Sequence, residues 1–276
     1  MSSDSTKPIG LFDSGFGGLT VLKQVRQLLP YENIAYLGDT ARLPYGSKSP
    51  QTIIQYAEEN AQFLLEKQIK LLLVACHTAC SHSFEILRQQ LPIPVIGVIE
   101  PGFKLLAQAT RTKRVAVLGT ASTIGSGVYQ KLFSAQFPQI QLYPTACPLF
   151  VPLIEEGYSG HLAAEWIAKD YLSHLEKEGI DAALLACTHY PLMRAIIQKT
   201  LGAHVQLIEP AQAVAEEAAS VLGRLNLLNT NCEPASLEFY ASDDPEKFQR
   251  LGKAFLDCEI DRVSLKKKSE SAIEKK

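Results

Sequence analysis

Two cysteines, Cys76 and Cys187, stand in nearly the same local sequence. LLLVACHTACS covers residues 71–81 and LLACTHYPL covers residues 184–192; in each, an apolar run ends in Ala-Cys and meets Thr and His. A thiol that opens a helix lies near the positive end of the helix dipole, which lowers its pKa from about 8.5 and favours the basic, nucleophilic thiolate. A single cysteine of this kind is often only a small buried apolar residue, but two in equivalent settings predict a functional pair.

The segments around the cysteines predict an α/β fold. Short apolar runs alternate with amphipathic stretches, and residues 53–65 repeat apolar side chains at helical spacing. Apolar strands separated by helices predict largely parallel sheets that bind ligands outside the carboxyl ends of their strands, where both cysteines stand. The predicted strands cover residues 9–12, 34–37, 71–75, 95–99, 115–119, 140–143, 183–186, 205–208 and 237–241.

An internal repeat extends beyond the cysteines. PIGLFDSGFGGLTVL (8–22) and RVAVLGTASTIGSGVY (114–129) both read as a strand, a turn of small residues and a helix. Asp13 precedes Cys76 by 63 residues, and Thr120 precedes Cys187 by 67. The repeat predicts two similar three-layer α/β domains that face one another, with the active site in the cleft between them.

Composition excludes several classes of protein. The chain has 276 residues, 46% of them hydrophobic, and a net charge of −2, which gives no electrostatic reason to expect a nucleic-acid partner. The segment MSSDSTKP lacks the apolar core of a secretion signal, and no apolar run is long enough to span a membrane, so we expect a cytoplasmic protein with reduced thiols and no membrane partner. Residues 266–276, KKKSESAIEKK, predict a disordered charged tail.

Two alternative sites match the sequence less well. A dinucleotide fingerprint beginning at Gly15 needs a glycine at position 20, where Thr20 stands. A metal site is the other alternative, but its candidate ligands lack the second Cys or His pair that makes zinc spacing specific. Those candidate ligands are Cys76, His77, Cys80 and His82.

Five ordered segments resemble the glutamate racemases, a family of the cofactor-independent aspartate/glutamate racemase superfamily: GLFDSGFGGLTVL, YLGDTARLPYG, VACHTA, PLFVPLIEEG and LLACTHYPL. The resemblance covers nearly all of residues 8–260 and implies that the second domain, residues 98–208, is inserted into the first, residues 1–97 and 209–265. It implies an isomerase that interconverts L- and D-glutamate for peptidoglycan synthesis without cofactor or metal. A homodimer is the candidate oligomer. The rival hypothesis is a catalytically impaired racemase fold kept as a binding or regulatory module.

The resemblance also implies a role for each site residue. Inverting a carbon needs a base on one face and an acid on the other, and Cys76 and Cys187 would be this pair. Asp13 would assist Cys76, while His189, supported by Glu155, would assist Cys187. Asp39 and Arg42 would shape a loop. The implied substrate-binding residues are Asp13, Ser14, Tyr45, Gly46, His77, Thr78, Thr188 and His189. Without the resemblance, Ser14, Thr78 and Thr188 would be explained as helix caps, and Glu155 as a surface carboxylate.

His77 departs from the family pattern. The family usually has Asn-Thr-Ala after the first catalytic cysteine, whereas this chain has His77-Thr78-Ala79, followed by Cys80. Like asparagine, histidine donates and accepts hydrogen bonds, but its ring is larger and has a reference pKa of about 6.5. We therefore expect its charge to change between about pH 5 and 8 and to alter the pH dependence of activity.

Overall fold

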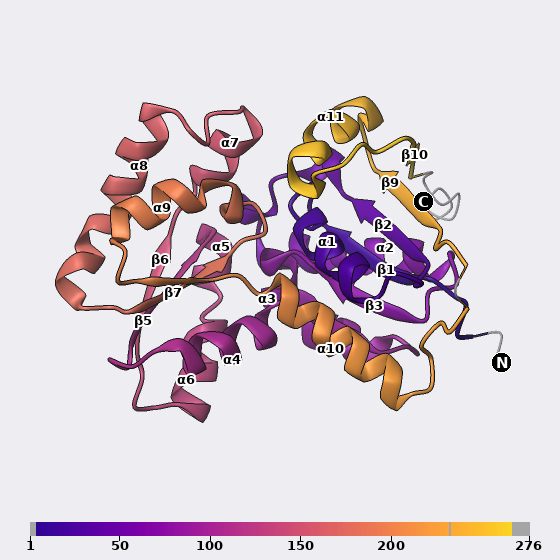
Figure 1. Ribbon diagram of the computed structural model, residues 1–276, viewed down its shortest axis with the longest axis horizontal. Helices are drawn as coiled ribbons and strands as arrows, with labels where there is room; N and C mark the ends of the chain where they lie inside the picture. The colour runs from indigo at the N-terminus through magenta and orange to yellow at the C-terminus, as the bar shows by residue number, and fades with distance from the viewer. Residues whose placement is uncertain (1–3, 232, 267–276) are drawn as a thin grey trace, which may run out of the picture.

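The computed structural model describes residues 4–231 and 233–266, and within these residues the strands form two parallel sheets (Figure 1). The first sheet has the strand order β10-β9-β2-β1-β3-β4, and the second has the order β6-β5-β7-β8; every neighbouring pair is parallel. The strands are β1 (Ile9–Asp13), β2 (Ile34–Gly38), β3 (Leu71–Val74), β4 (Val95–Gly97), β5 (Arg114–Gly119), β6 (Gln141–Ala146), β7 (Ala182–Ala186), β8 (Gln206–Ile208), β9 (Leu237–Ala241) and β10 (Val263–Leu265).

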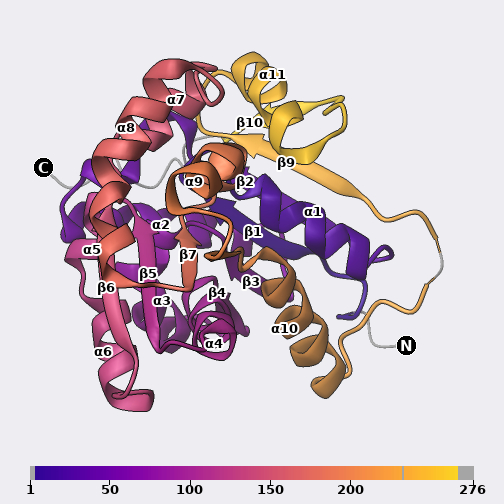
Figure 2. The same cartoon turned by 60° about the vertical axis from the view of Figure 1, so that its left-hand side comes forward.

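Helices cover both faces of each sheet. In the first domain α1, α10 and α11 pack together on one face, and α2 and α3 lie on the other (Figures 1 and 2). In the second domain α8 and α9 lie on one side, and α4 and α6 on the other (Figure 1). The helices are α1 (Leu19–Leu28), α2 (Pro50–Leu65), α3 (His77–Gln90), α4 (Ile99–Ala109), α5 (Ala121–Gly125), α6 (Val128–Gln136), α7 (Phe150–Glu155), α8 (Leu162–Leu172), α9 (Arg194–Leu201), α10 (Ala211–Arg224) and α11 (Pro245–Leu256).

The two sheets share one strand order, which confirms the predicted fold class. The order β2-β1-β3-β4 in the first sheet recurs as β6-β5-β7-β8 in the second. Strands β3 and β7, which precede the two cysteines, therefore occupy equivalent central positions. The chain leaves the first sheet after β4 and returns to the first domain with α10. The predicted division into residues 1–97 with 209–265 and residues 98–208 would assign one sheet to each part.

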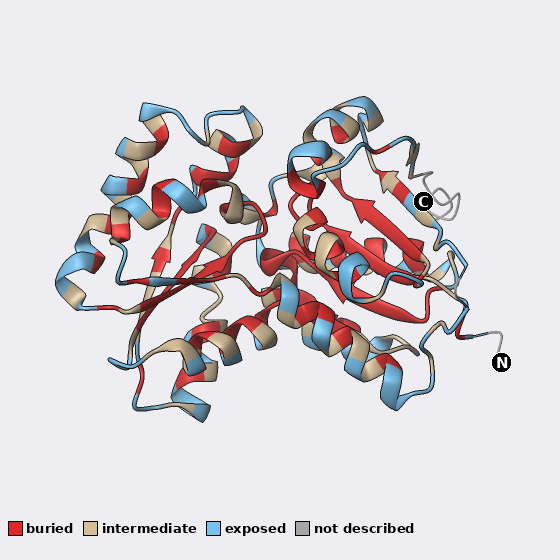
Figure 3. Cartoon of the chain, viewed as in Figure 1, coloured by how far each residue is buried: buried red, intermediate tan, exposed pale blue. Residues whose placement is uncertain are grey.

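Local sequence explains how α2 forms and packs. Ser49 caps its first turn by accepting a hydrogen bond from the Thr52 N–H at 3.3 Å, and Pro50 stands at the first helical position, where proline is tolerated. The buried face of the helix carries Ile53 and Leu64, and burying an aliphatic side chain of this size contributes about 1.5–3 kcal/mol. The strands of the first sheet are likewise mostly buried (Figure 3). Such double coverage produces the continuous apolar runs seen in the sequence.

The observed strands differ from the predicted ones mainly at their ends. The strand predicted over 95–99 stops at Gly97 because Ile99 begins α4, and the strand predicted over 140–143 continues to Ala146. Strand β10 was not predicted. Of the predicted charged tail, residues 267–276 lie outside the described residues, while the Lys266 N–H donates to the Ala241 carbonyl at 2.7 Å. No helix within residues 4–231 and 233–266 combines the length and apolar character needed to cross a membrane.

Candidate active site

Cys76 and Cys187 line one small cavity between the two domains. Each follows the carboxyl end of its strand, β3 or β7, and the cavity measures about 20 Å³. Of the predicted site residues, those on the cavity wall are Ser14, Tyr45, Gly46, Cys76, His77, Thr78, Cys187, Thr188 and His189. Leu43, Pro44, Thr120 and Val151 also line it, and sequence reasoning did not select them.

A larger cavity of about 750 Å³ is lined by residues of α3, α4 and α10. Its wall includes Cys80 and His82, and it contains none of the residues predicted to act on substrate except His77's neighbours on α3. Cavity size therefore does not mark the candidate active site. The convergence of two thiols, several hydroxyls and two imidazoles marks the smaller one.

The Cys76 thiol lies at the start of α3. Its sulfur accepts a hydrogen bond from the Ala79 N–H at 3.5 Å, and the thiol donates to Ser14 Oγ at 3.6 Å. Burial nevertheless raises the pKa of Cys76 to about 11, and the nearby charge of Asp13 adds to the shift. The prediction that the helix dipole lowers this pKa is wrong for the protein without substrate, because desolvation of the thiolate outweighs the donors at the helix start.

The Cys187 thiol has a different local setting. Strand β7 is followed by a short 3-10 turn at Tyr190–Met193, so Cys187 does not cap an α-helix as the sequence predicted. Burial raises the pKa of Cys187 well above its ordinary value, although the backbone N–H groups of His189 and Tyr190 oppose the rise. Both thiols are therefore protonated near neutral pH in the protein without substrate.

Asp13 links the two domains beside Cys76. It ends β1 and is fully buried; its Oδ2 accepts from the Gly15 N–H at 2.9 Å, and its Oδ1 accepts from the Thr188 hydroxyl at 3.3 Å. Burial raises the pKa of Asp13, and the electrostatic interaction with His189 opposes this rise. Asp13 thus sits within electrostatic reach of both predicted catalytic cysteines.

Buried His189 and partly buried Glu155 form a pair. His189 Nε2 and Glu155 Oε1 are 3.0 Å apart, and the imidazole packs edge-on against Phe255 with 5.3 Å between ring centroids. Glu155 is the last residue of α7, so α7 delivers the carboxylate that orients this ring. The sequence-based expectation that Glu155 is more than a surface carboxylate agrees with its contact; its role in the reaction stays a prediction.

Thr78 connects α3 to the second domain. Its hydroxyl lies 2.9 Å from Thr120 Oγ1 and 3.2 Å from Thr123 Oγ1. Thr120 caps α5 by accepting from the Thr123 N–H at 3.2 Å. Thr120 directly follows β5, the second domain's first strand, whereas Asp13 is the last residue of β1, so the two lie at nearly equivalent places and the internal repeat held the signal that selects Thr120.

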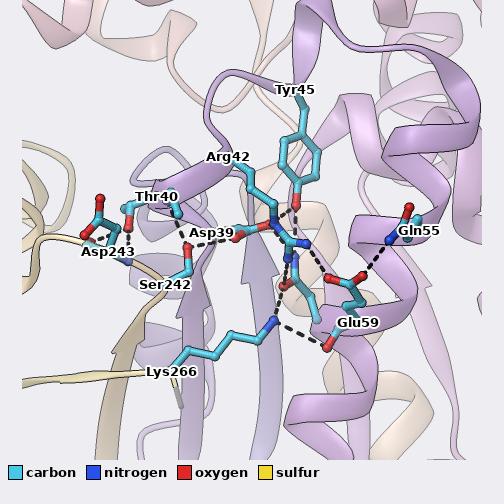
Figure 4. Close-up of polar contacts among 11 residues, drawn as sticks. Asp39, Thr40, Arg42, Tyr45, Gln55, Glu59, Ser242, Asp243 and Lys266 are labelled. Carbon is cyan, nitrogen blue, oxygen red and sulfur yellow. Dashed lines mark hydrogen bonds and ion pairs between the residues drawn. The ribbon is translucent and has the colours of Figure 1, made fainter. Parts of the chain in front are cut away.

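Tyr45 and Gly46 lie on the segment between β2 and α2. The Tyr45 hydroxyl donates to Asp39 Oδ2, so it points toward the Asp39–Arg42 ion pair (Figure 4). Gly46 passes so close to Thr120 that an added Cβ would lie 2.8 Å from the Thr120 Cβ. Asp39 and Arg42 thus anchor the loop through the Tyr45 hydroxyl, and Tyr45 and Gly46 line the cavity.

His77 is enclosed at the cavity wall. Its side chain is 2% exposed, and neither ring nitrogen has a hydrogen-bond partner among the described residues. Burial lowers the pKa of His77 to about 3. The expectation that its charge changes between about pH 5 and 8 is therefore wrong: desolvation keeps the ring neutral over that range.

The structure gives other reasons for the residues of the two alternative sites, the glycine-rich dinucleotide fingerprint and the Cys/His metal site. An added Cβ on Gly17 would lie 2.2 Å from Thr188 Oγ1 and 2.6 Å from His189 Nδ1, so glycine here allows the second domain to approach α1. The four candidate metal ligands do not converge, since Cys76 contacts Ser14 whereas His82 Nε2 lies 2.9 Å from Ser122 Oγ. Among the residues with described positions, no group of three or more His, Cys, Asp or Glu could hold a metal ion.

Comparison with known proteins identifies the family. The family model described as Asp/Glu/Hydantoin racemase matches residues 19–218. The chain belongs to this racemase family. The curated glutamate racemase of Geobacter metallireducens is 46% identical over 93% of this chain and 95% of its own length. The glutamate racemase of Chlorobaculum tepidum is 44% identical over 96% of this chain and 97% of its own.

Solved racemase structures share the fold. The glutamate racemase of Francisella tularensis, crystallised with D-glutamate, superimposes with a TM-score of 0.90 at 38% identity, covering 95% of this chain and 98% of that one. The Thermus thermophilus enzyme in complex with beta-chloro-D-alanine gives a TM-score of 0.85 at 39% identity, with the same coverage. Family membership makes this chain a racemase, an isomerase built on two α/β domains.

Proposed function

We propose that this protein interconverts L- and D-glutamate by a two-base mechanism in which Cys76 and Cys187 act from opposite faces of the α-carbon. One observation carries the proposal: two thiols, each following an equivalent strand of two similar domains, line a single cavity. Relatives that are more than 40% identical over nearly their whole length and named glutamate racemase support glutamate as substrate. Two retained cysteines favour catalysis over a fold kept only for binding.

The reaction needs one thiolate and one thiol. The thiolate takes the α-proton, the electron pair stays on the substrate as a carbanion, and the opposite thiol delivers its proton to the other face. The two sulfurs end with their protonation states exchanged, and the roles reverse for the other enantiomer. Because both resting thiols have raised pKa values, we expect the substrate ammonium to favour formation of the thiolate.

The remaining residues bind or assist. Asp13 would assist proton transfer at Cys76, and His189, oriented by Glu155, would assist Cys187. Hydroxyls and backbone N–H groups at the cavity wall suit the substrate carboxylate. A cavity of about 20 Å³ holds about one water molecule, so we expect the domains to separate when glutamate binds. We propose no cofactor or metal, and a cytoplasmic supply of D-glutamate to peptidoglycan synthesis.

Circular dichroism tests the activity directly. Purified protein in chelator-treated buffer is incubated with L-glutamate and, separately, with D-glutamate. The proposal predicts that both signals decay to zero, because the two enantiomers have equal free energy. A signal that stays constant with both enantiomers would contradict it.

A further inference from the structure

Asn60 is a buried amide on the otherwise apolar face of α2. It is fully enclosed, and the neighbouring buried positions of the helix include Ala57, Ala61 and Leu64. Burying an amide costs free energy unless its hydrogen bonds are made. An asparagine at this position therefore needs hydrogen-bond partners that offset the free-energy cost of its desolvation.

All four hydrogen-bonding positions of Asn60 are used. Its Nδ2 donates to Asp39 Oδ2 at 3.2 Å and to the Tyr45 hydroxyl at 3.0 Å. Its Oδ1 accepts from Arg42 Nη2 at 3.1 Å and from Lys266 Nζ at 2.8 Å. The orientation of the amide follows from charge, since the reverse would set its NH₂ against two cations and its oxygen against a carboxylate.

These partners fix the segment that joins β2 to α2. Asp39 Oδ2 also accepts from Arg42 Nε at 2.7 Å and from the Tyr45 hydroxyl, and its Oδ1 accepts from Ser242 Oγ at 2.8 Å (Figure 4). The Arg42 guanidinium lies over the Tyr56 ring, 4.1 Å from its centroid. Asp39 is fully buried, and these donors satisfy both of its carboxylate oxygens.

The opposite side of the same segment forms one wall of the cavity. Tyr45 and Gly46 line it together with Cys76 and Cys187. Tyr45 therefore connects the two sides: its hydroxyl is held by Asn60 and Asp39, and the residue lines the cavity. Loss of the hydrogen bonds to the Tyr45 hydroxyl would remove the contacts that fix Tyr45 at the cavity wall.

We propose that Asn60 is a positioning residue for substrate binding: it holds the Tyr45 hydroxyl and the Arg42 guanidinium so that the Tyr45–Gly46 wall is formed before substrate arrives. Lys266, which follows β10, donates to Asn60 Oδ1 and so connects this network to the last described residue of the chain. The inference rests on the proposed function, in which Tyr45 and Gly46 bind glutamate. Asn60 itself does not line the cavity.

The test compares Asn60→Leu with Tyr45→Phe and with the double variant. Leucine keeps a similar volume but removes all four hydrogen bonds, and phenylalanine removes only the hydroxyl that Asn60 contacts. We expect Asn60→Leu to raise KM for both enantiomers about ten-fold, the equivalent of one or two hydrogen bonds, with kcat changed less than about two-fold. Both changes remove the hydrogen bond between Asn60 and the Tyr45 hydroxyl, so their effects on KM should be less than additive in the double variant.

Hydrogen exchange gives a readout independent of activity. Amides of residues 40–48 should exchange faster in Asn60→Leu than in the wild type, and those of residues 182–189 should be unchanged. Gln62→Ala is the matched control, because Gln62 lies on the exposed face of α2 and its side chain makes no hydrogen bond to Asp39, Arg42, Tyr45 or Asn60 among the described residues. It should match the wild type in KM and in exchange.

Each outcome is decisive. A lowered melting temperature with unchanged KM and unchanged exchange at residues 40–48 would mean that Asn60 only stabilises the fold, and an additive double variant would mean that it acts apart from Tyr45; either overturns the proposal. If Asn60→Leu does not fold, Asn60→Ala, which also removes all four hydrogen bonds, is compared with the wild type in KM and in exchange at residues 40–48. If the wild type does not racemise glutamate, the proposed function fails, while hydrogen exchange still tests whether Asn60 holds the segment.

Discussion

Thr188 donates its hydroxyl to Asp13 Oδ1 at 3.3 Å and so joins the loop that carries Cys187 to the end of the strand beside Cys76. A second contact in the same region, 2.9 Å between the hydroxyl oxygens of Thr78 and Thr120, also connects the two domains. The relative position of the two thiols therefore depends on how closely the domains pack, and a change that separates them should reduce activity without unfolding either domain.

Gly17→Ala tests this dependence. The new Cβ would lie 2.2 Å from Thr188 Oγ1, so the loop carrying Cys187 must shift away from α1. We expect kcat/KM to fall at least about ten-fold, since small misplacements of reacting groups are costly, with little change in far-UV circular dichroism. Gly160→Ala is the control, because nothing lies within 4 Å of its added Cβ. Equal activities for the two variants would show that close approach at Gly17 does not matter.

Cys76→Ser and Cys187→Ser should each reduce kcat by about 10³-fold or more, because a serine hydroxyl is a far poorer proton acceptor than a thiolate. Steady-state racemisation in both directions measures the loss. Cys147→Ser is the matched control: Cys147 is also buried but lies outside the cavity, 3.8 Å from the Thr145 carbonyl oxygen. Near-native turnover in either cavity variant would remove that cysteine from the mechanism.

His77→Asn should alter stability at acidic pH. The pKa of His77 is lowered by burial to about 3, so in the unfolded chain the ring gains a proton near pH 6.5 while in the folded protein it stays neutral. Its contribution is present above pH 6.5 and is lost as pH falls toward 3. The wild type should therefore lose roughly 2 kcal/mol more than His77→Asn between about pH 6 and pH 4. Urea unfolding of both proteins measures this, and parallel stability curves would mean that His77 is not buried as a neutral ring.

His189→Asn should affect mainly the proton transfer at Cys187. The overall equilibrium constant of racemisation is fixed, so kcat/KM must change equally in both directions. The rate-limiting step, however, can differ between the two directions. We expect the α-deuterium isotope effect on kcat to increase for one enantiomer only. Glu155→Gln should give a smaller change in the same direction, since the amide still contacts His189 Nε2. Isotope effects that rise equally for both enantiomers would contradict a role specific to Cys187.

The sequence predicted the fold where local pattern decides it. Strands β1, β2 and β3 were predicted to within one residue, because strands buried on both faces are continuous apolar runs bounded by polar or glycine residues. Strand β10 was missed because it has only three residues, none of them buried, and so carries no apolar pattern. Its place in the sheet comes from pairing with β9.

The site was predicted less completely, because some of its features arise from tertiary contact. Motifs selected nine of the residues that line the cavity. They did not select Asn60, whose partners come from other segments, or the sign of the thiol pKa shifts. A helix start in isolation favours thiolate, but burial in the folded protein removes water from Cys76 and reverses the effect. Enclosure likewise keeps His77 neutral, which its sequence neighbours do not indicate.

The central claim is that two thiols act from opposite faces of one carbon. The most direct test incubates the wild-type protein with L-glutamate in deuterium oxide, stops the reaction at low conversion, separates the enantiomers and measures α-deuterium in each by NMR. Two bases predict that the D-glutamate formed carries solvent deuterium while the recovered L-glutamate keeps its α-proton, because one thiolate takes the proton and the other thiol, exchanged with solvent, returns a deuteron. D-glutamate that retains the original α-proton, or L-glutamate that gains deuterium as fast as D-glutamate forms, would show that a single base serves both faces and would contradict the assignment of Cys76 and Cys187.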